Sequence, residues 1–169
     1  MGETITTQIV PVRDVTYEQF KKFLDSLDEE RKSWSLDLQN YKNDKEFYES
    51  MAYAIVCIYG EEIIGLCNAY SMLLKRAIEI SFVVKKEYQS QGIGSTLLKK
   101  AEWDTKRNTP YEYITAKHYK DNIASHKAFL KAGYEKWTFD RIQGNNGGYF
   151  YREEMVDDDT WDWKIKEIG

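Results

Sequence analysis

The sequence predicts an α/β domain with a mixed sheet, and three patterns support this prediction. Apolar runs of strand length alternate with longer amphipathic runs, so strands and helices follow one another along the chain. Gly60-Glu61 lies between two apolar runs and is typical of a hairpin, which joins antiparallel strands. A glycine-containing segment, residues 89–98, links an apolar run to an amphipathic one, as in a strand–loop–helix unit. Hairpins combined with helical crossovers require a mixed sheet.

The first half of the chain predicts a strand, a capped helix and a hairpin. Thr16 and Gln19 form a capping-box pattern, and the apolar residues that follow recur at helical spacing. Residues 28–51 are charged and polar with scattered aromatics, which predicts one or two short helices. The strands are predicted at 6–12, 51–59 and 62–71, and the capped helix at 17–27.

The second half predicts further strands and two longer helices. Pro110 ends the first of these helices, and Gly133 stands just past the end of the second. The strands are predicted at 77–84, 111–117, 134–141 and 149–155, and the helices at 93–107 and 122–132. We expect one domain over residues 1–156. The acidic and aromatic residues 157–169 form a tail that covers a sheet edge or a partner, or is mobile.

Composition excludes several classes of protein. A chain of 169 residues with 42% hydrophobic and 31% charged residues is typical of one soluble domain with a proper core. A net charge of -4 argues against nucleic acid as the main partner. No apolar run is long enough to span a membrane, and residues 1–10 show no secretory signal, so we expect a cytoplasmic protein. Cys57 and Cys67 are predicted as core thiols in a reducing compartment rather than a disulfide.

The segment around Gly92 and Gly94 is a candidate phosphate site. Glycine lets the backbone approach a ligand closely, and the helix that follows presents unpaired amides at the positive end of its dipole. Two known phosphate loops do not match. The dinucleotide fingerprint requires glycine where Leu97 stands, and the Gly-Lys-Ser/Thr of the nucleoside-triphosphate loop does not occur. The glycines alone are also compatible with a loop that needs them only for chain geometry.

Two motifs resemble those of the GCN5-related N-acetyltransferase (GNAT) superfamily. Gln89, Gly92 and Gly94 match its Gln/Arg-x-x-Gly-x-Gly/Ala motif, and residues 122–134 are similar to its asparagine-to-glycine second motif. The two lie at the family's separation, with a strand between them. The resemblance implies a mixed, mostly antiparallel central sheet, flanked by helices, whose fourth and fifth strands splay apart. It covers residues 77–134 by motif and the first 70 residues by layout only.

The resemblance also implies acetyl-coenzyme A (acetyl-CoA) as cosubstrate. The pantetheine arm would pair with residues 82–84, and the pyrophosphate would rest on amides of residues 91–96. Asn122 would lie near the arm, cap its helix, or do both, and Lys127 would reach a phosphate or remain solvated. The residues expected to bind the cofactor are Phe82, Val83, Val84, Gln89, Gln91, Gly92, Ile93, Gly94, Ser95, Thr96, Asn122, Lys127 and Phe129.

The implied reaction is acetyl transfer to a primary amine by direct attack in a ternary complex. The alternative is a non-catalytic acyl-CoA sensor or interaction module with the same fold. Glu79 resembles the glutamate that some family members use as general base, or is a strand carboxylate that faces solvent or pairs with a lysine. The expected partners are acetyl-CoA and an amine, with neither nucleic acid nor membrane; a homodimer stays open. Residues 25–50 and 141–148 would select the acceptor amine, whose identity the sequence does not reveal.

One departure from the family concerns Phe129. Many members carry there a tyrosine that protonates the leaving thiolate, and phenylalanine has no proton to give. We favour a thiolate that leaves unassisted; the alternatives are a substitute such as His118 or Tyr119, or weak or absent catalysis. His118 and His126 are the only histidines. Without clustered Cys or Asp partners they predict no metal site, and His126 is expected on an exposed helix face.

Overall fold

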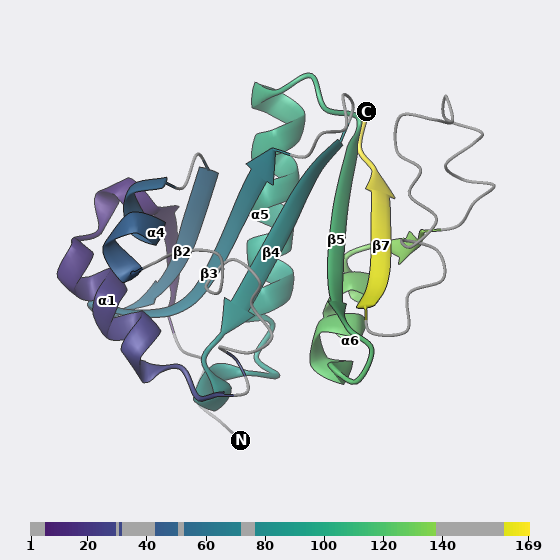
Figure 1. Cartoon of the computed structure of the whole chain (residues 1–169). Coiled ribbons are helices and arrows are strands. Elements are labelled where there is room, and N and C mark those ends of the chain that lie inside the picture. Colours follow the sequence, from purple (N-terminus) through teal and green to yellow (C-terminus); the bar gives the residue numbers. More distant parts are fainter. Residues whose placement is uncertain (1–5, 30, 32–42, 51–52, 72–76, 138–160) are drawn as a thin grey trace.

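A mixed sheet organises the part of the chain that the structure describes, which is residues 6–29, 31, 43–50, 53–71, 77–137 and 161–169. In this computed structural model, its strands follow the order β1-β2-β3-β4-β5-β7-β6 (Figure 1). The strands are β1 (Gln8–Pro11), β2 (Tyr53–Tyr59), β3 (Glu62–Ser71), β4 (Ala77–Val84), β5 (Tyr113–Tyr119), β6 (Glu135–Lys136) and β7 (Trp161–Glu167). Neighbouring strands run antiparallel except β4 and β5, which confirms the predicted mixed, mostly antiparallel sheet.

Helices cover both faces of this sheet. Successive side chains of a strand point to opposite faces, so a strand with apolar residues at successive positions needs cover on both sides. On one face, Ile55 and Cys57 of β2 pack with α5 and with Phe129 of α6. On the other face, Ala54 and Val56 pack with α1 and α4. The helices are α1 (Tyr17–Ser26), α4 (Asp44–Ser50), α5 (Ile93–Asn108) and α6 (Ile123–Lys131), with short 3-10 turns at Val12–Asp14 and Lys86–Tyr88. No helix of the described residues is both long and apolar enough to cross a membrane.

Local sequence signals set several element boundaries as predicted. At α1, the backbone N–H of Gln19 donates to Thr16 Oγ1 (3.1 Å), and the N–H of Thr16 donates to Gln19 Oε1 (2.9 Å). This reciprocal pair is a capping box, which satisfies amides that lack partners inside the helix. Gly60 turns the β2–β3 hairpin with φ 66°, and Gly133 follows α6 with φ 90°, a region that glycine enters without strain.

The cysteines lie on neighbouring strands, and both are buried thiols outside any disulfide, which confirms the predicted core thiols. In the β2–β3 register, Cys57 pairs with Gly65 and Cys67 pairs with Ile55, so the two thiols are not opposite each other. Burial raises the pKa of the Cys57 thiol, because the low-polarity core disfavours the thiolate.

β4 and β5 pair over a short stretch and then diverge. Their parallel register contains three residue pairs, Ala77 with Tyr113, Ile78 with Ile114 and Glu79 with Thr115. β4 stays paired with β3 as far as Val84, and β5 stays paired with β7 as far as Tyr119. Each strand therefore keeps its other neighbour, and the sheet opens between them in the lower half of Figure 1. This confirms the predicted splay.

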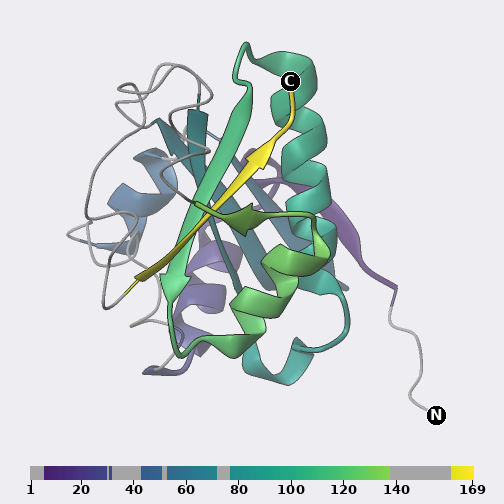
Figure 2. The ribbon, with the colours of Figure 1, turned by 90° about the vertical axis from the view of Figure 1, so that its right-hand side faces the viewer.

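The prediction that residues 157–169 form a tail outside the domain is wrong for residues 161–167, which belong to the sheet. Trp161–Glu167 forms β7, which pairs with β5 along its length and with β6 on its other side (Figure 2). The strand was missed because acidic residues at 157–159 and 162 interrupt its apolar pattern. Its Trp163 and Ile165 pack with Tyr113 and Trp137 in a separate apolar cluster. The predicted strand 149–155 lies outside the described residues, and the one at 134–141 is described only to residue 137.

The capping box predicts a measurable contribution to stability. Thr16→Ala removes the side-chain acceptor of the Gln19 N–H, and such a loss typically costs about 1 kcal/mol. We expect the free energy of unfolding, measured by urea denaturation, to fall by about that amount. Thr16→Ser keeps the acceptor and serves as control; equal stability of the alanine and serine variants would contradict the role of the cap.

Candidate active site

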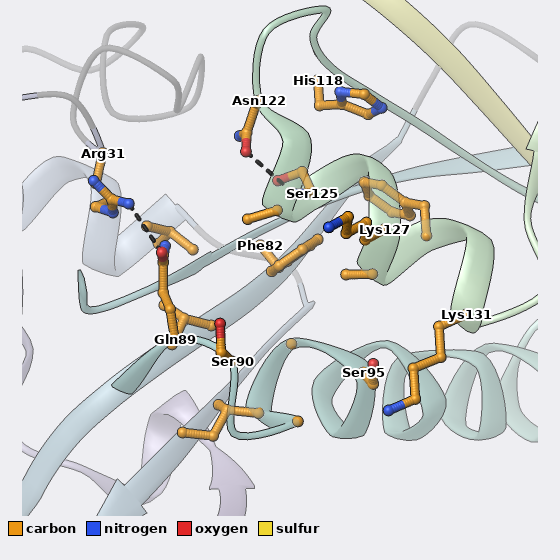
Figure 3. A pocket seen from close by; sticks show the side chains of 18 of the residues that line it. Arg31, Phe82, Gln89, Ser90, Ser95, His118, Asn122, Ser125, Lys127 and Lys131 are labelled. Carbon is orange, nitrogen blue, oxygen red and sulfur yellow. Dashed lines mark hydrogen bonds between the residues drawn. The ribbon is translucent and has the colours of Figure 1, made fainter. Parts of the chain in front are cut away.

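A cavity of about 310 Å³ lies where β4 and β5 diverge. Its walls come from the end of β4 and the end of β5, and from the turn before α5 together with the first turn of α5. The start and the inner face of α6 close it on another side (Figure 3). Eleven of the predicted cofactor residues line it, namely Phe82, Val83, Val84, Gln89, Gly92, Ile93, Gly94, Ser95, Asn122, Lys127 and Phe129. Gln91 and Thr96 belong to the same loop and helix start but are not among the lining residues.

The start of α5 forms one wall of the cavity. Gly92 is the N-cap with φ 81°, and Ser90 before it also has a positive φ of 63°, so the chain turns sharply into the helix. A Cβ atom on Gly94 would lie 2.9 Å from Cε2 of Phe82, which is closer than carbon atoms approach without a shift. Gly94 therefore allows the helix to pass close to the Phe82 ring. The first amides of α5 lack helical partners and carry the positive end of the dipole.

Asn122 has the capping role predicted for it. Its side-chain Oδ1 accepts a hydrogen bond from the N–H of Ser125 (3.1 Å), and both residues line the cavity (Figure 3). The side chain is nearly buried, at 6% exposure. Asn122 therefore both caps α6 and forms part of the cavity wall.

Phe129 lies at the centre of an aromatic group beside the cavity. Its ring meets Phe82 edge-on at a centroid distance of 5.3 Å and Tyr134 at 5.1 Å. The ring of His118 stacks on it at 5.9 Å and 15°. Although Phe129 lines the cavity, it is only 2% exposed, so most of the ring serves packing.

Glu79 lies next to the cavity and does not line it. It is 5% exposed, which contradicts the alternative of a carboxylate that faces solvent. Strand alternation puts Glu79 on the same side of β4 as Ser81, which does line the cavity, and on the side opposite Ile80 in the core against α5. Glu79 is also the last residue of β4 that pairs with β5, so it marks the point where the strands part.

Arg31 is a cavity residue that sequence reasoning missed. Its Nη2 donates to Gln89 Oε1 (3.0 Å), and its Nη1 donates to Asp28 Oδ2 (2.9 Å). These bonds connect the segment after α1 to the loop before α5 (Figure 3). Arg31 lies in the polar stretch 28–51, which has no hydrophobic periodicity that would indicate a buried position, although the side chain is only 8% exposed.

The cavity is cationic in a protein of net negative charge. Its described lining contains Arg31, Lys117, Lys127 and Lys131 and no carboxylate. Lys127 and Lys131 stand one turn apart on α6, and Lys131 lies across from Ser95 of α5 (Figure 3). With the α5 amides, this surface suits a ligand that carries several negative charges.

The two histidines and an aspartate meet behind Phe129, which contradicts the expectation that no Asp partner lies near the histidines. His118 pairs in register with Asp162 of β7, and His126 of α6, half-buried rather than fully exposed, faces the same carboxylate. Burial lowers the pKa of His118. Burial alone would raise the pKa of Asp162, but the hydrogen bond and the charge of Lys164 hold it below its usual value. Sequence reasoning missed Asp162 because it assigned the residue to the tail.

Comparison with known proteins identifies the family. Residues 16–134 match the Acetyltransferase (GNAT) family, and this segment is more than half of the chain. The chain therefore belongs to that family. No curated protein matches the sequence.

Solved structures share the fold at low sequence identity. The GNAT domain of S. lividans PAT superposes with a TM-score of 0.71 at 16% identity, over 95% of this chain and 90% of that one. A GNAT-family acetyltransferase from Staphylococcus aureus Mu50 gives 0.69 at 14% identity, over 97% and 100%. Campylobacter jejuni N-acetyltransferase PseH in complex with acetyl coenzyme A gives 0.63 at 11% identity, over 97% and 100%. The fold of the chain is thus that of GNAT acetyltransferases.

Proposed function

We propose that this protein transfers an acetyl group from acetyl-CoA to a primary amine, by direct attack of the amine within a ternary complex. The observation that carries the proposal is the cationic cavity between the diverging β4 and β5, with the start of α5 as its wall. It offers anion-binding amides, lysines and an open strand edge in one place. Family membership supports acetyl-CoA as the acyl donor.

The cofactor would bind across the cavity in two parts. The pyrophosphate would accept hydrogen bonds from amides of residues 91–96, with Lys127 at the opposite wall. The pantetheine arm contains amide groups. β4 pairs with β5 only as far as Glu79, so beyond that residue one edge of β4 has no strand beside it among the described residues. The backbone of residues 82–84 can therefore pair with the pantetheine arm along that edge. Gln89 would act indirectly, by holding Arg31 at the cavity.

The chemistry requires a proton acceptor and stabilisation of an oxyanion. The amine nitrogen forms a bond to the thioester carbonyl carbon, the C–S bond breaks, and the proton of the amine passes to Glu79. Since Glu79 stands behind Ser81 and does not line the cavity, we expect the proton to cross through a water molecule. A backbone N–H near Val84 would stabilise the oxyanion of the tetrahedral intermediate.

Loss of the thiolate needs no acid in this proposal. Phe129 has no proton to donate, and thiolates are tolerable leaving groups near neutral pH. His118, one of the alternative donors, stacks on the Phe129 ring. Its Nδ1 lies 2.8 Å from the carbonyl oxygen of Tyr119, however, and its Nε2 faces Asp162, so neither nitrogen is directed at an open part of the cavity.

The second candidate function is a non-catalytic acyl-CoA sensor, which Phe129 favours. The purified protein should be incubated with acetyl-CoA and a library of primary amines, and the release of free thiol measured. We expect thiol release that depends on one class of amine. Binding of acetyl-CoA without thiol release across the library would support the sensor instead, and absence of binding would contradict both functions.

We expect Gly94→Glu to abolish acetyl-CoA binding. The variant adds bulk next to the Phe82 ring and a negative charge where the pyrophosphate would lie. Isothermal titration calorimetry measures the effect. Gly94→Ala separates the steric part. Lys99→Glu introduces a carboxylate at an exposed position of α5, with twice the change in net charge, and should leave the affinity within a few-fold. An unchanged affinity in Gly94→Glu would place the cofactor elsewhere.

We expect Phe129→Tyr to fold normally and to have turnover at least equal to that of the parent. The tyrosine keeps the ring, and its hydroxyl should point into the cavity that Phe129 lines. The free energy of unfolding should change by less than about 1.5 kcal/mol, as for other swaps that conserve shape. A loss of several kcal/mol would mean that the hydroxyl enters the dry aromatic group without a partner, and that Phe129 is not beside the thiol.

We expect Glu79→Gln to lower kcat while the affinity for acetyl-CoA stays unchanged. The amide keeps the shape of the side chain but removes its basicity, and general bases typically contribute about a hundred- to ten-thousandfold. Allowing for proton loss to water, kcat should fall at least about tenfold, and the rise in rate toward alkaline pH should move or flatten. Full activity with an unchanged pH profile would leave Glu79 as a structural carboxylate.

A further inference from the structure

Three side chains from different elements converge behind Phe129. His118 comes from β5, His126 from α6 and Asp162 from β7, and one donor atom of each lies within 4.8 Å of the others. None of these residues has a role in the proposed base chemistry. The cluster joins two imidazoles and a carboxylate, a donor set that suits zinc and neighbouring transition metals.

The hydrogen bonding of His118 orients one nitrogen into the cluster. Its Nδ1 lies 2.8 Å from the carbonyl oxygen of Tyr119, so the Nδ1–H donates there and the lone pair of the neutral ring is on Nε2. The ring is 4% exposed, and among the described residues Nε2 has no hydrogen-bond partner. Metal-binding histidines commonly donate their second N–H to a backbone carbonyl in this way.

The spacing of the donor atoms fits a small cation. His118 Nε2 lies 3.8 Å from Asp162 Oδ2, and His126 Nδ1 lies 3.7 Å from the same oxygen. Ligands bound tetrahedrally at about 2.1 Å from a zinc ion stand about 3.4 Å apart. The two pairs that involve Asp162 are within a few tenths of an ångström of that spacing. All three donor atoms lie within 4.8 Å of one another, so the two imidazoles would have to approach each other by up to about 1.4 Å to bind one ion.

We propose that His118, His126 and Asp162 form a site for a late first-row divalent cation, of the class of Zn²⁺ and Co²⁺. Three protein ligands leave the fourth position of a tetrahedral site to water. His126 and Asp162 are half-buried, so the cation can enter from the surface of α6 and β7 without passing through the cavity.

Lys164 opposes this cation and sets a limit to its affinity. Its Nζ lies 2.7 Å from Asp162 Oδ2, and the residue is only 1% exposed. Oδ2 is also the oxygen that both histidines face, so the cation and Lys164 compete for it, while Oδ1 of Asp162 is buried and has no hydrogen-bond partner among the described residues. The nearby ammonium repels a divalent cation, and its removal should tighten binding.

The test uses the untagged, chelator-treated full chain, titrated with Zn²⁺ by calorimetry and with Co²⁺ by visible absorption. We expect one ion per chain and the absorption of Co²⁺ with nitrogen and oxygen ligands. The chain has two histidines, so His126→Ala removes one of the two imidazoles and leaves His118 as the other. That variant and Asp162→Asn should each weaken binding at least about tenfold, as loss of a ligand or its support typically does.

Lys164→Met is the matched variant, because it removes the competing charge and keeps a long side chain. It should bind both ions more tightly than the parent. Circular dichroism establishes that each variant is folded. The proposal is overturned if the parent chain binds neither ion stoichiometrically, or if folded His126→Ala and Asp162→Asn bind as tightly as the parent. The measurement needs no acetyl-CoA, so its failure would leave the proposed transferase function untouched.

Discussion

The short register between β4 and β5 is the constraint on which the rest of the site depends. Parallel pairing lasts for three residue pairs, after which each strand follows its other neighbour, β3 or β7. The divergence leaves an open edge of β4 and admits a cavity inside a sheet that is otherwise continuous. Backbone groups at such an edge need partners, and a ligand with amide groups can supply them.

The cavity also depends on how closely α5 approaches β4. Ile93, Leu97, Leu98 and Ala101 bury one face of α5 in the core, which fixes the helix on the sheet. Gly94 then brings the first turn against the Phe82 ring, so the free amides of the helix lie at the cavity and not in solvent. Packing of the helix thus places an anion-binding surface at the cavity. A single Cβ atom at residue 94 would push against the Phe82 ring and shift that surface.

Electrostatics add a second level of organisation around Phe129. On the cavity side, Lys127 and Lys131 line the cavity, and Lys131 lies across from Ser95 of α5. On the far side, Lys164 and Asp162 form an ion pair beside the two histidines. The ring of Phe129 contacts the rings of Phe82, Tyr134 and His118, so it packs next to both polar regions. His118 is the residue common to both, because it lines the cavity and contributes to the cluster.

The sequence by itself determined most of the local structure. The capping box at Thr16, the turn at Gly60, the α6 end at Gly133 and the strand Ala77–Val84 were all predictable, because each depends on residues close together in the chain. The loop with Gly92 and Gly94 was predictable in the same way, and eleven of the thirteen residues expected to bind the cofactor, these glycines included, do line the cavity.

The tertiary structure alone decided which distant residues meet. Arg31 reaches Gln89, and Asp162 reaches His118 and His126, through contacts that span tens of residues. The sequence of β7 was misleading, since acidic residues interrupt its apolar alternation. Its burial comes from Tyr113 of β5 and from Trp137, which follows β6. Sequence patterns record the preference of a segment for helix or strand, whereas sheet register and side-chain clustering follow from the packing of the whole chain, which no local pattern contains.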